Sequence, residues 1–293
     1  MKILFMGTPE FAKISLEYLV TNKFEIAGAV TNPDKPAGRK MILTRPPVKE
    51  YALQKKIPVY QPENLKSEEF YDLLKKINPD MIVVVAYGKI LPKNVLDFPE
   101  YGCVNVHASL LPEYRGASPI SAAIINGEKE TGITTIFMDE GIDTGDIILK
   151  KPIGIGENDT YGEIYDKLAQ IGGELLIETL VQIENKTEKR EKQPETVSAC
   201  VPKIKKDACE IDWELPPKKI HDKIRGLSPY PAAFTWIGGK KLKIYRSKIN
   251  EKNILELLEV QLEGGKKMNA GDFINGRKDI LREGGLLKFF SQV

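Results

Sequence analysis

Two hydrogen-bonding side chains, those of Asn105 and His107, lie at the end of a short apolar run near the middle of this chain. Cys103–His107 alternates with the two-residue period of a β-strand, so the two polar residues share one face. Turn-forming residues follow from Pro112, and a strand that ends there places the pair where open α/β sheets bind ligands. An amide beside an imidazole can stabilise negative charge and move a proton. A buried structural histidine is the alternative, and the strand alone does not separate the two interpretations.

A second polar segment, Glu140–Asp146, places three acidic residues and two glycines in one loop between strand-like runs. Such loops can bind calcium, but this one lacks the D-x-D spacing and the rest of a calcium loop. The chain has three cysteines without a C-x-x-C pair and only two histidines, so its sequence offers no cluster of metal ligands. We therefore expect no metal and interpret Asp143 or Asp146 as the charge partner of a nearby group.

A basic segment from Thr31 to Pro47 has no apolar period and contains five prolines and glycines. A compact domain seldom keeps a loop of about 15 residues without a use for it. One interpretation is a mobile arm that reaches for phosphates, and the alternative is a disordered insertion with solvated charges. The basic residues of the segment are Lys35, Arg39, Lys40 and Arg45.

The formal charge is unevenly distributed along the 293 residues. Residues 1–184 carry 20 Lys and Arg against 26 Asp and Glu, whereas residues 185–293 carry 23 against 15. A basic region behind an acidic one favours a polyanionic partner held by the basic region, although a solvated basic surface is also common. The basic region includes a cluster formed by Lys203, Lys205 and Lys206.

The elements that must position these groups form a doubly wound α/β pattern. Lys2–Met6 and Glu25–Val30 are expected strands around a helix that Thr8 would cap, which completes a βαβ unit. The turn between them lacks the second and third glycines of G-x-G-x-x-G, so a dinucleotide fingerprint is excluded. Asp80–Ala86 is an unbroken apolar run typical of a central parallel strand. The loop after it, with Gly88, either approaches a flat ligand or is a plain turn.

The carboxyl-terminal part predicts a second, smaller β-rich domain. Phe234–Ile237 and Lys240–Arg246 flank Gly238-Gly239, a strong hairpin signal. Small β-rich domains include the OB barrel, whose open face often binds nucleic acid. After Ile249 the chain passes quickly to Gly264-Gly-Lys-Lys, so the expected barrel is short by some residues, either truncated or lacking a loop.

The composition is that of an ordinary globular protein, with 42% hydrophobic and 29% charged residues. The apolar run after Lys2 is far too short for a signal peptide, and no run approaches the length of a membrane span. We expect a cytoplasmic protein that acts as a monomer without membrane contact.

The motifs together resemble the formyltransferases that use 10-formyltetrahydrofolate. In the first part of the chain the resemblance rests on Phe5–Ala12, Pro33–Arg39, Ala86–Pro92, Asn105, His107, Ser109–Pro112, Arg115–Pro119 and Gly141–Asp146. In the second part it rests on Ile211-Asp-Trp213 and Ile224–Pro231. The Asn, His and Asp set identifies the superfamily, and the basic loop and second domain favour the members that act on a charged tRNA.

This resemblance implies the chemistry and the site residues. An amine attacks the formyl carbon on N10 of the folate, Asn105 donates to the developing oxyanion, His107 transfers a proton, and Asp143 orients the histidine ring. Folate, as co-substrate, is expected at Ala86, Tyr87, Gly88, Ile90, Ser109, Leu110, Leu111 and Pro112. Initiator methionyl-tRNA is expected at Lys35, Arg39, Lys40, Lys203, Lys205 and Lys206. The implied domains are a catalytic domain at 1–188, a linker at 189–206, and an OB-like tRNA-binding domain at 207–293.

Two alternative functions remain, one a formyltransferase with another acceptor and the other a protein without enzymatic activity. A formyltransferase acting on a nucleotide-linked amino sugar would also need two domains, but it has no use for a basic second domain. An RNA-binding protein on a catalytically silent scaffold would bind tRNA without folate turnover, and the intact Asn105, His107 and Asp143 argue against it.

Overall fold

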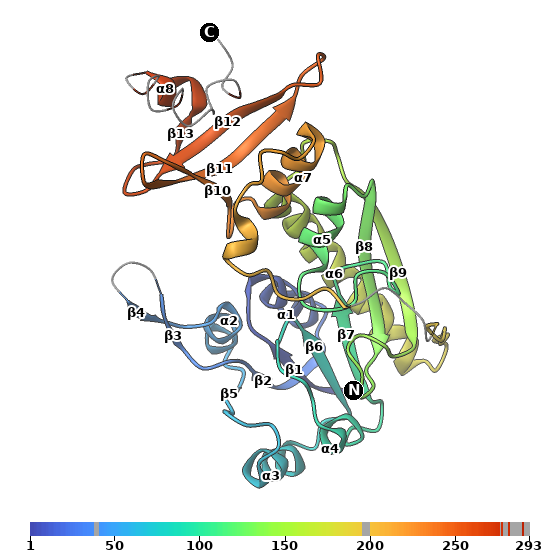
Figure 1. Ribbon diagram of the computed structural model, residues 1–293. Coiled ribbons are helices and arrows are strands. Elements are labelled where there is room, and N and C mark those ends of the chain that lie inside the picture. The colour runs from blue at the N-terminus through green and yellow to red at the C-terminus, as the bar shows by residue number, and fades with distance from the viewer. Residues whose placement is uncertain (38–40, 195–199, 276, 278–280, 282–288, 290–293) are drawn as a thin grey trace. The chain divides into compact units, whose positions relative to one another are not determined.

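The computed structural model describes residues 1–37, 41–194, 200–275, 277, 281 and 289 (Figure 1). The chain forms two compact units. Unit 1 comprises residues 1–117, 132–152 and 166–200, and unit 2 comprises residues 118–131, 153–165 and 201–293. Two short segments that precede the last part of unit 1, residues 118–131 and 153–165, thus belong to unit 2, an arrangement that chain order alone does not reveal.

A seven-stranded sheet in the order β5-β2-β1-β6-β7-β8-β9 forms the centre of unit 1. Its strands are β1 (Lys2–Gly7), β2 (Glu25–Val30), β5 (Val59–Tyr60), β6 (Met81–Val85), β7 (Cys103–His107), β8 (Glu130–Phe137) and β9 (Ile147–Gly154). The strands from β5 to β7 pair in parallel, and β8 joins β7 antiparallel. Every side chain of β6 is buried, as its apolar run predicted, and full burial of one valine contributes about 1.5–3 kcal/mol. The doubly wound, mostly parallel sheet is confirmed.

Helices pack against this sheet and complete its hydrophobic core. They are α1 (Glu10–Thr21), α2 (Pro47–Gln54), α3 (Glu68–Ile77), α4 (Lys93–Leu96) and α6 (Tyr161–Glu184). The expected cap of α1 was wrong, because Pro9 occupies the N-cap position without a side-chain hydrogen bond. The hydroxyl of Thr8 instead accepts hydrogen bonds from the backbone and side chain of Asn32.

The basic segment contains a small β-hairpin, where the sequence predicted only a loop. Its strands are β3 (Lys35–Ala37) and β4 (Ile42–Thr44), which pair antiparallel. Two-stranded hairpins carry little sequence signal when their side chains are exposed, and Ile42, Leu43 and Thr44 all are.

Unit 2 combines helices with a four-stranded antiparallel sheet in the order β10-β11-β12-β13. Its elements are α5 (Pro119–Asn126), the 3₁₀ turn η1 (Asp207–Cys209), α7 (Pro217–Leu227), β10 (Ala233–Ile237), β11 (Lys240–Ile249), β12 (Leu255–Leu262), β13 (Met268–Asn269) and α8 (Ala270–Ile274). The predicted hairpin is present, and both turn glycines have positive φ, 52° and 72°. The long strand β12 was missed, because its charged residues obscured the alternation.

Among the described residues, no helix is both long and apolar enough to cross a membrane.

Candidate active site

The parallel strands of unit 1 bring their carboxyl ends to one edge of the sheet. β1, β2, β6 and β7 pair in parallel, so the residues that follow them meet at this edge. Thr8 follows β1, Asn32 follows β2, Ala86 follows β6, and His107 ends β7. The edge therefore collects the polar residues that the sequence distributes over 100 positions.

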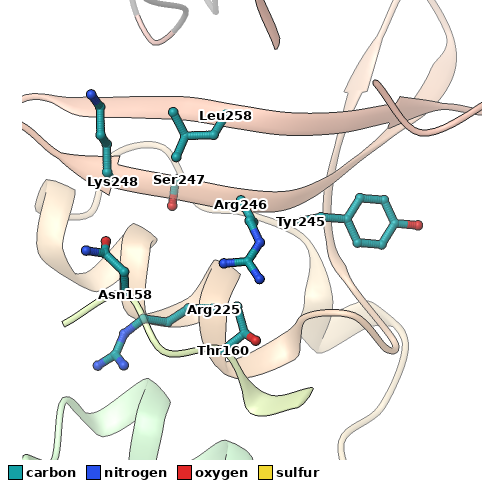
Figure 2. Close-up of a pocket in the computed structure, with 8 residues that line it drawn as sticks. All are labelled: Asn158, Thr160, Arg225, Tyr245, Arg246, Ser247, Lys248 and Leu258. Carbon is teal, nitrogen blue, oxygen red and sulfur yellow. The ribbon is translucent and has the colours of Figure 1, made fainter. Parts of the chain in front are cut away.

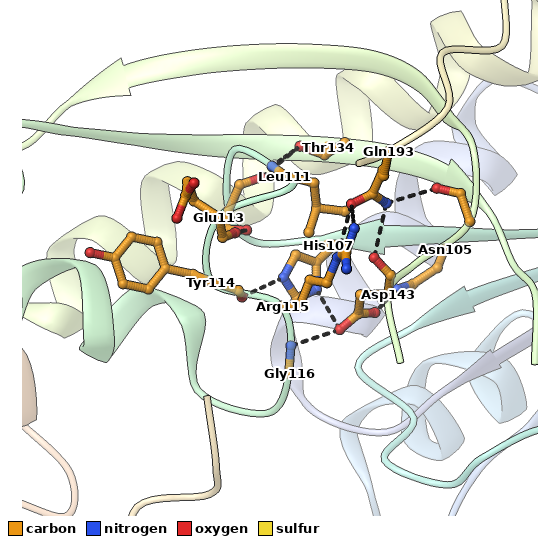
Figure 3. Close-up of polar contacts among 12 residues, drawn as sticks. Asn105, His107, Leu111, Glu113, Tyr114, Arg115, Gly116, Thr134, Asp143 and Gln193 are labelled. Carbon is orange, nitrogen blue, oxygen red and sulfur yellow. Dashed lines mark hydrogen bonds and ion pairs between the residues drawn. The ribbon is translucent and has the colours of Figure 1, made fainter. Parts of the chain in front are cut away.

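Two of the three predicted catalytic residues, Asn105 and His107, converge on the carboxylate of the third, Asp143 (Figure 3). Its Oδ1 accepts a hydrogen bond from Nδ2 of Asn105 at 3.1 Å, and its Oδ2 lies 3.4 Å from Nδ1 of His107. The backbone N–H of Gly116 also donates to Oδ2, at 2.9 Å. The predicted choice between Asp143 and Asp146 is thereby decided, because Asp143 is the acidic residue that contacts the histidine ring.

The backbone around Asp143 is held in an unusual conformation. Asp143 has φ of +55°, a left-handed value that costs energy for a residue other than glycine. The amide of Gln193 donates to the carbonyl oxygens of Asp143 and Gly145, at 2.9 and 2.7 Å. A Cβ at Gly145 would lie 1.7 Å from the carbonyl oxygen of Phe137, so only glycine fits there. These contacts stabilise the loop that presents the carboxylate.

The ring of His107 is 6% exposed and has an oxygen atom beside each nitrogen. Nε2 lies 3.0 Å from the carbonyl oxygen of Tyr114, while Nδ1 faces Asp143. Only a ring with a proton on each nitrogen can donate to both oxygens. This arrangement fixes the orientation of the ring and suits it to hold or deliver a proton at Nδ1.

The turn after His107 is fixed by the neighbouring strand β8. The hydroxyl of Thr134 donates to the carbonyl oxygen of Ser109 at 2.7 Å and accepts from the backbone N–H of Leu111 at 3.0 Å. The hydroxyl of Ser109 donates to the carbonyl oxygen of Glu113, and the side chains of Ser109 and Leu111 are buried. Leu110 and Pro112 are partly exposed, so they are the side chains of the predicted folate turn that a ligand could touch.

In the Ala86–Ile90 loop, the side chain of Tyr87 is buried while its neighbours Ala86 and Gly88 are exposed. The ring of Tyr87 is 2% exposed, and burial raises the pKa of its hydroxyl to about 12. Its carbonyl oxygen accepts a hydrogen bond from Nδ2 of Asn32 at 2.9 Å. Ala86, Gly88 and Ile90 are exposed, and no atom lies within 4 Å of where a Cβ on Gly88 would be. A flat ligand would therefore meet these three residues, with Tyr87 acting through its backbone.

The predicted tRNA contacts fall in both units. Lys35 lies in unit 1, and Lys203, Lys205 and Lys206 lie in unit 2 before η1. All four side chains are exposed to solvent. Arg39 and Lys40 lie outside the described residues.

Sequence reasoning missed two residues that support the site. The guanidinium of Arg115 is 8% exposed and donates from Nε and Nη2 to Oε1 of Gln193, at 3.0 and 2.7 Å. Gln193 in turn holds the Asp143 loop. Arg115 stands in a motif quoted for the resemblance, but Gln193 lies 50 residues from Asp143 in a charge-rich stretch that predicted only a linker. No local signal marks it.

A separate pocket in unit 2 contains none of the predicted catalytic residues (Figure 2). It is lined by Asn158, Thr160, Arg225, Tyr245, Arg246, Ser247, Lys248 and Leu258. Its cations are already paired, because Arg246 contacts Glu163 at 2.8 Å and Lys248 contacts Glu256 at 3.1 Å. The described part of the chain also contains no group of three or more side chains placed to hold a metal ion.

Comparison with known proteins assigns both parts of the chain. Residues 1–180 match the family model described as formyl transferase, and residues 203–254 match the formyl transferase C-terminal domain. The methionyl-tRNA formyltransferase of Caldicellulosiruptor saccharolyticus is 48% identical over 314 residues, covering 98% of this chain and 100% of its own.

Two solved structures share the fold at low sequence identity. A methionyl-tRNA formyltransferase from Clostridium thermocellum has a TM-score of 0.61 at 22% identity, covering 89% of this chain and 98% of its own. An N-formyltransferase from Helicobacter canadensis, in complex with folinic acid and dTDP-3-aminofucose, has a TM-score of 0.65 at 24% identity, covering 85% and 88%. Identities this low support a common fold and nothing finer.

Proposed function

This chain belongs to the formyl transferase family, and we propose that it transfers the formyl group of 10-formyltetrahydrofolate to the α-amino group of methionyl initiator tRNA. Support for this acceptor comes from a relative that carries the name methionyl-tRNA formyltransferase at 48% identity over nearly the whole chain. The solved sugar N-formyltransferases that share the fold are more distant, for example at 24% and 20% identity. Such a reaction belongs to translation initiation, which favours the cytoplasm.

The observation that carries the proposed formyl transfer is the convergence of Asn105 and His107 on the carboxylate of Asp143. A primary amide has two N–H donors, and one of those on Asn105 is directed to Asp143. The other is available to a formyl oxygen as negative charge develops on it. Removal of one such donor costs about 3–4 kcal/mol in other enzymes.

His107 and Asp143 have complementary roles in this proposal. His107 gives a proton to N10 of the departing folate and takes one from the attacking amine, which suits general acid–base catalysis. Asp143 orients the ring, and its own geometry is fixed by Gly116 and Gln193. The attacking α-amino group needs no activating residue, since free α-amines titrate near ~8.

The folate donor is proposed to lie against the Ala86–Ile90 loop and the Ser109–Pro112 turn. The open space above Gly88 and the exposed Ala86 and Ile90 fit a flat ring system, and the backbone of both segments offers hydrogen bonds. Bound there, the donor supplies the formyl carbon; the protein supplies orientation, charge and a proton.

The proposed domains are a catalytic domain at 1–188, a linker at 189–206 and a tRNA-binding domain at 207–293. The tRNA is proposed to contact the tRNA-binding domain and the lysines of the linker. One face of the β10–β11 hairpin supports RNA binding, because Trp236 is 50% exposed and lies opposite Lys241. The Lys241 ammonium lies 3.8 Å from the ring centre of Phe234 and 5.1 Å from that of Trp236. Aromatic rings beside cations suit unpaired bases and phosphates.

One assay tests the proposal directly. The full chain is incubated with 10-formyltetrahydrofolate and one of three amine acceptors: methionyl initiator tRNA, an amino-sugar nucleotide, or glycinamide ribonucleotide. We expect formyl transfer to the tRNA and a rate that falls steeply with added salt, because phosphate contacts release counterions. Preferential formylation of either small acceptor would overturn the proposed substrate, and no transfer to any of them would overturn the proposed activity.

A further inference from the structure

A closed polar cluster lies at the base of the β3–β4 hairpin in unit 1. The ammonium of Lys49 donates to both oxygens of Asp34, at 2.7 and 2.8 Å, and to Oε1 of Gln61 at 2.7 Å. The amide nitrogen of Gln61 donates to Oδ1 of Asp34 at 2.9 Å and to the carbonyl oxygen of Asn32 at 2.8 Å. We name Asp34, Lys49 and Gln61 the hairpin clamp.

The clamp differs from a common surface ion pair. The side chains of Lys49 and Asp34 are only 18% and 20% exposed, and Gln61 bridges them with both its donor and its acceptor. Hydrogen bonds from Lys49 and then from Gln61 lower the pKa of the Asp34 carboxyl. Exposed pairs often contribute nothing measurable, whereas removal of one partner from a shielded network leaves the others unpaired.

The position of the clamp in the chain gives it a mechanical role. Asp34 directly precedes β3, Lys49 lies in α2 shortly after β4, and Gln61 follows the edge strand β5. The ion pair therefore ties together the two ends of the excursion that carries Lys35 and Arg45. Gln61 ties both ends to the sheet, which fixes the direction in which the hairpin leaves the sheet.

Asn32 connects the clamp to the proposed folate loop. Its carbonyl oxygen accepts from Gln61, and its amide donates to the carbonyl oxygen of Tyr87 at 2.9 Å and to the hydroxyl of Thr8 at 3.0 Å. One continuous set of hydrogen bonds thus runs from the hairpin base to the backbone beside Gly88.

We propose that Asp34, Lys49 and Gln61 are positioning residues that hold the hairpin in the direction required by the acceptor tRNA, without contacting the reacting atoms. This inference rests on the proposed function, because it assigns the hairpin to a large anionic acceptor. The clamp acts on the tRNA. A small acceptor and the folate stay unaffected, because the side chain of Asn32 keeps its own hydrogen bonds to Tyr87 and Thr8 when the clamp is changed.

The test compares two acceptors in the same enzyme. Lys49→Met removes the charge and all three donated hydrogen bonds, and Gln61→Met keeps the ion pair but frees it from the sheet. Each variant is assayed with methionyl initiator tRNA and with the methionyl ester of adenosine, which has no stem. Lys151→Met is the matched control, because Lys151 pairs with Glu174 on the surface at 2.9 Å with 47% of its side chain exposed.

We expect Lys49→Met to raise the KM for tRNA about tenfold and Gln61→Met about threefold, with little change in kcat. The KM for folate and the rate with methionyl-adenosine should stay at wild-type values in both variants and in the control. Lys49→Arg should recover most of the tRNA affinity, since it restores the charge and several donors.

The outcomes separate the clamp from the proposed function. Equal losses on both acceptors, or wild-type KM for tRNA in both variants, overturn the positioning role. A lower melting temperature with unchanged KM identifies the clamp as structural only and also overturns it. A wild-type protein that formylates neither methionyl acceptor overturns the proposed function itself, and the clamp's role falls with it.

Discussion

The chain has two histidines, one in each unit, and their surroundings differ in one decisive respect. Both rings are nearly inaccessible, at 6% for His107 and 3% for His221. His107 ends a strand at the open edge of a sheet and faces the carboxylate of Asp143. His221 lies within helix α7 and contacts the hydroxyl of Ser247 and the carbonyl oxygen of Glu157, each at 2.9 Å.

The comparison teaches that neighbours, and not burial, separate a chemical histidine from a structural one. Burial lowers the pKa of His221, and the hydrogen bond to Glu157 opposes this only in part. The carboxylate of the nearby Asp222 forms ion pairs with Arg225, at 2.7 Å, and with Lys218, and not with the ring of His221. A neutral ring can donate from Nε2 to Glu157 and accept at Nδ1 from Ser247. His221 thus joins three segments of unit 2, whereas His107 shares a carboxylate with Asn105.

The strongest way to break this comparison is to replace each histidine in turn. His107→Asn should lower kcat about 10²- to 10⁴-fold and leave folate affinity nearly unchanged, because it removes the proton donor and preserves most of the volume. Single-turnover transfer and equilibrium folate binding measure the two quantities. His221→Gln is the matched control and should retain wild-type kcat at 25 °C. Substantial turnover by His107→Asn would end its assignment as a catalytic residue.

Replacement of the shared carboxylate is expected to have the next largest effect. Asp143→Asn keeps the shape but presents an amide to Nδ1 of His107, so kcat should fall about 10- to 100-fold. With its oxygen turned toward Gly116, the new amide keeps that hydrogen bond but sets its NH2 against the Nδ2 donor of Asn105, so the contact with Asn105 is lost as well. A kcat within twofold of wild type would show that the ring needs no charge partner, and the contrast with His221 would lose its basis.

The two histidines also show how far sequence reasoning reaches. The period of Cys103–His107 correctly placed Asn105 and His107 together, because strand alternation is a local rule. The acidic loop was found from its local composition of acidic residues and glycines, but only the fold could bring it to His107. Gln193 was missed, since its partners lie 50 and 48 residues away and its neighbours predict a linker. The hairpin and β12 were missed because exposed or charged strands lack the apolar alternation that marks buried ones.

Gln193 offers a sharper test of what holds the Asp143 loop. Gln193→Ala removes two hydrogen bonds to the loop. It also removes the side-chain oxygen that accepts the hydrogen bonds of the buried Arg115 guanidinium. We expect kcat to fall about three- to tenfold, because the carboxylate loses its fixed position without losing its charge. Gln193→Glu tests the geometry separately, since it keeps the contact with Arg115 but cannot donate to the carbonyl oxygens. An unchanged kcat in both variants would remove Gln193 from the site.

For His221 the expected effect is on stability. His221→Gln can keep only part of the bonding to Ser247 and Glu157, so the free energy of unfolding should fall by about 1–3 kcal/mol. Urea unfolding measured at pH 7.5 provides the value, with formyl transfer by the same sample as the control. A variant as stable as the wild type would show that the ring does not join these segments.

The smallest expected effect is a difference in pH dependence. Because the pKa of His221 is lower in the folded protein than the usual value of 6.5, the unfolded chain binds the proton first. The stability that the neutral ring contributes is complete above about pH 6.5 and is lost as the pH falls below it. Glu163 adds nothing in this range. Burial raises its pKa, but hydrogen bonds from Arg246 and Thr160 outweigh that and lower it to about 2, so its contribution is lost only below about pH 4.5.

Urea unfolding at pH 7.5, 6.5 and 5.5 isolates this effect when the wild type is compared with His221→Gln. The wild type should lose more stability than the variant over these two pH units, so the difference between the two proteins should shrink toward acid. The groups beside the ring, Arg225, Asp222 and Lys218, are present in both proteins, so they cancel in the comparison. A difference in unfolding free energy that stays constant with pH would mean that His221 binds its proton equally in the folded and unfolded states. Burial without a neighbouring carboxylate would then fail to explain how the two histidines differ.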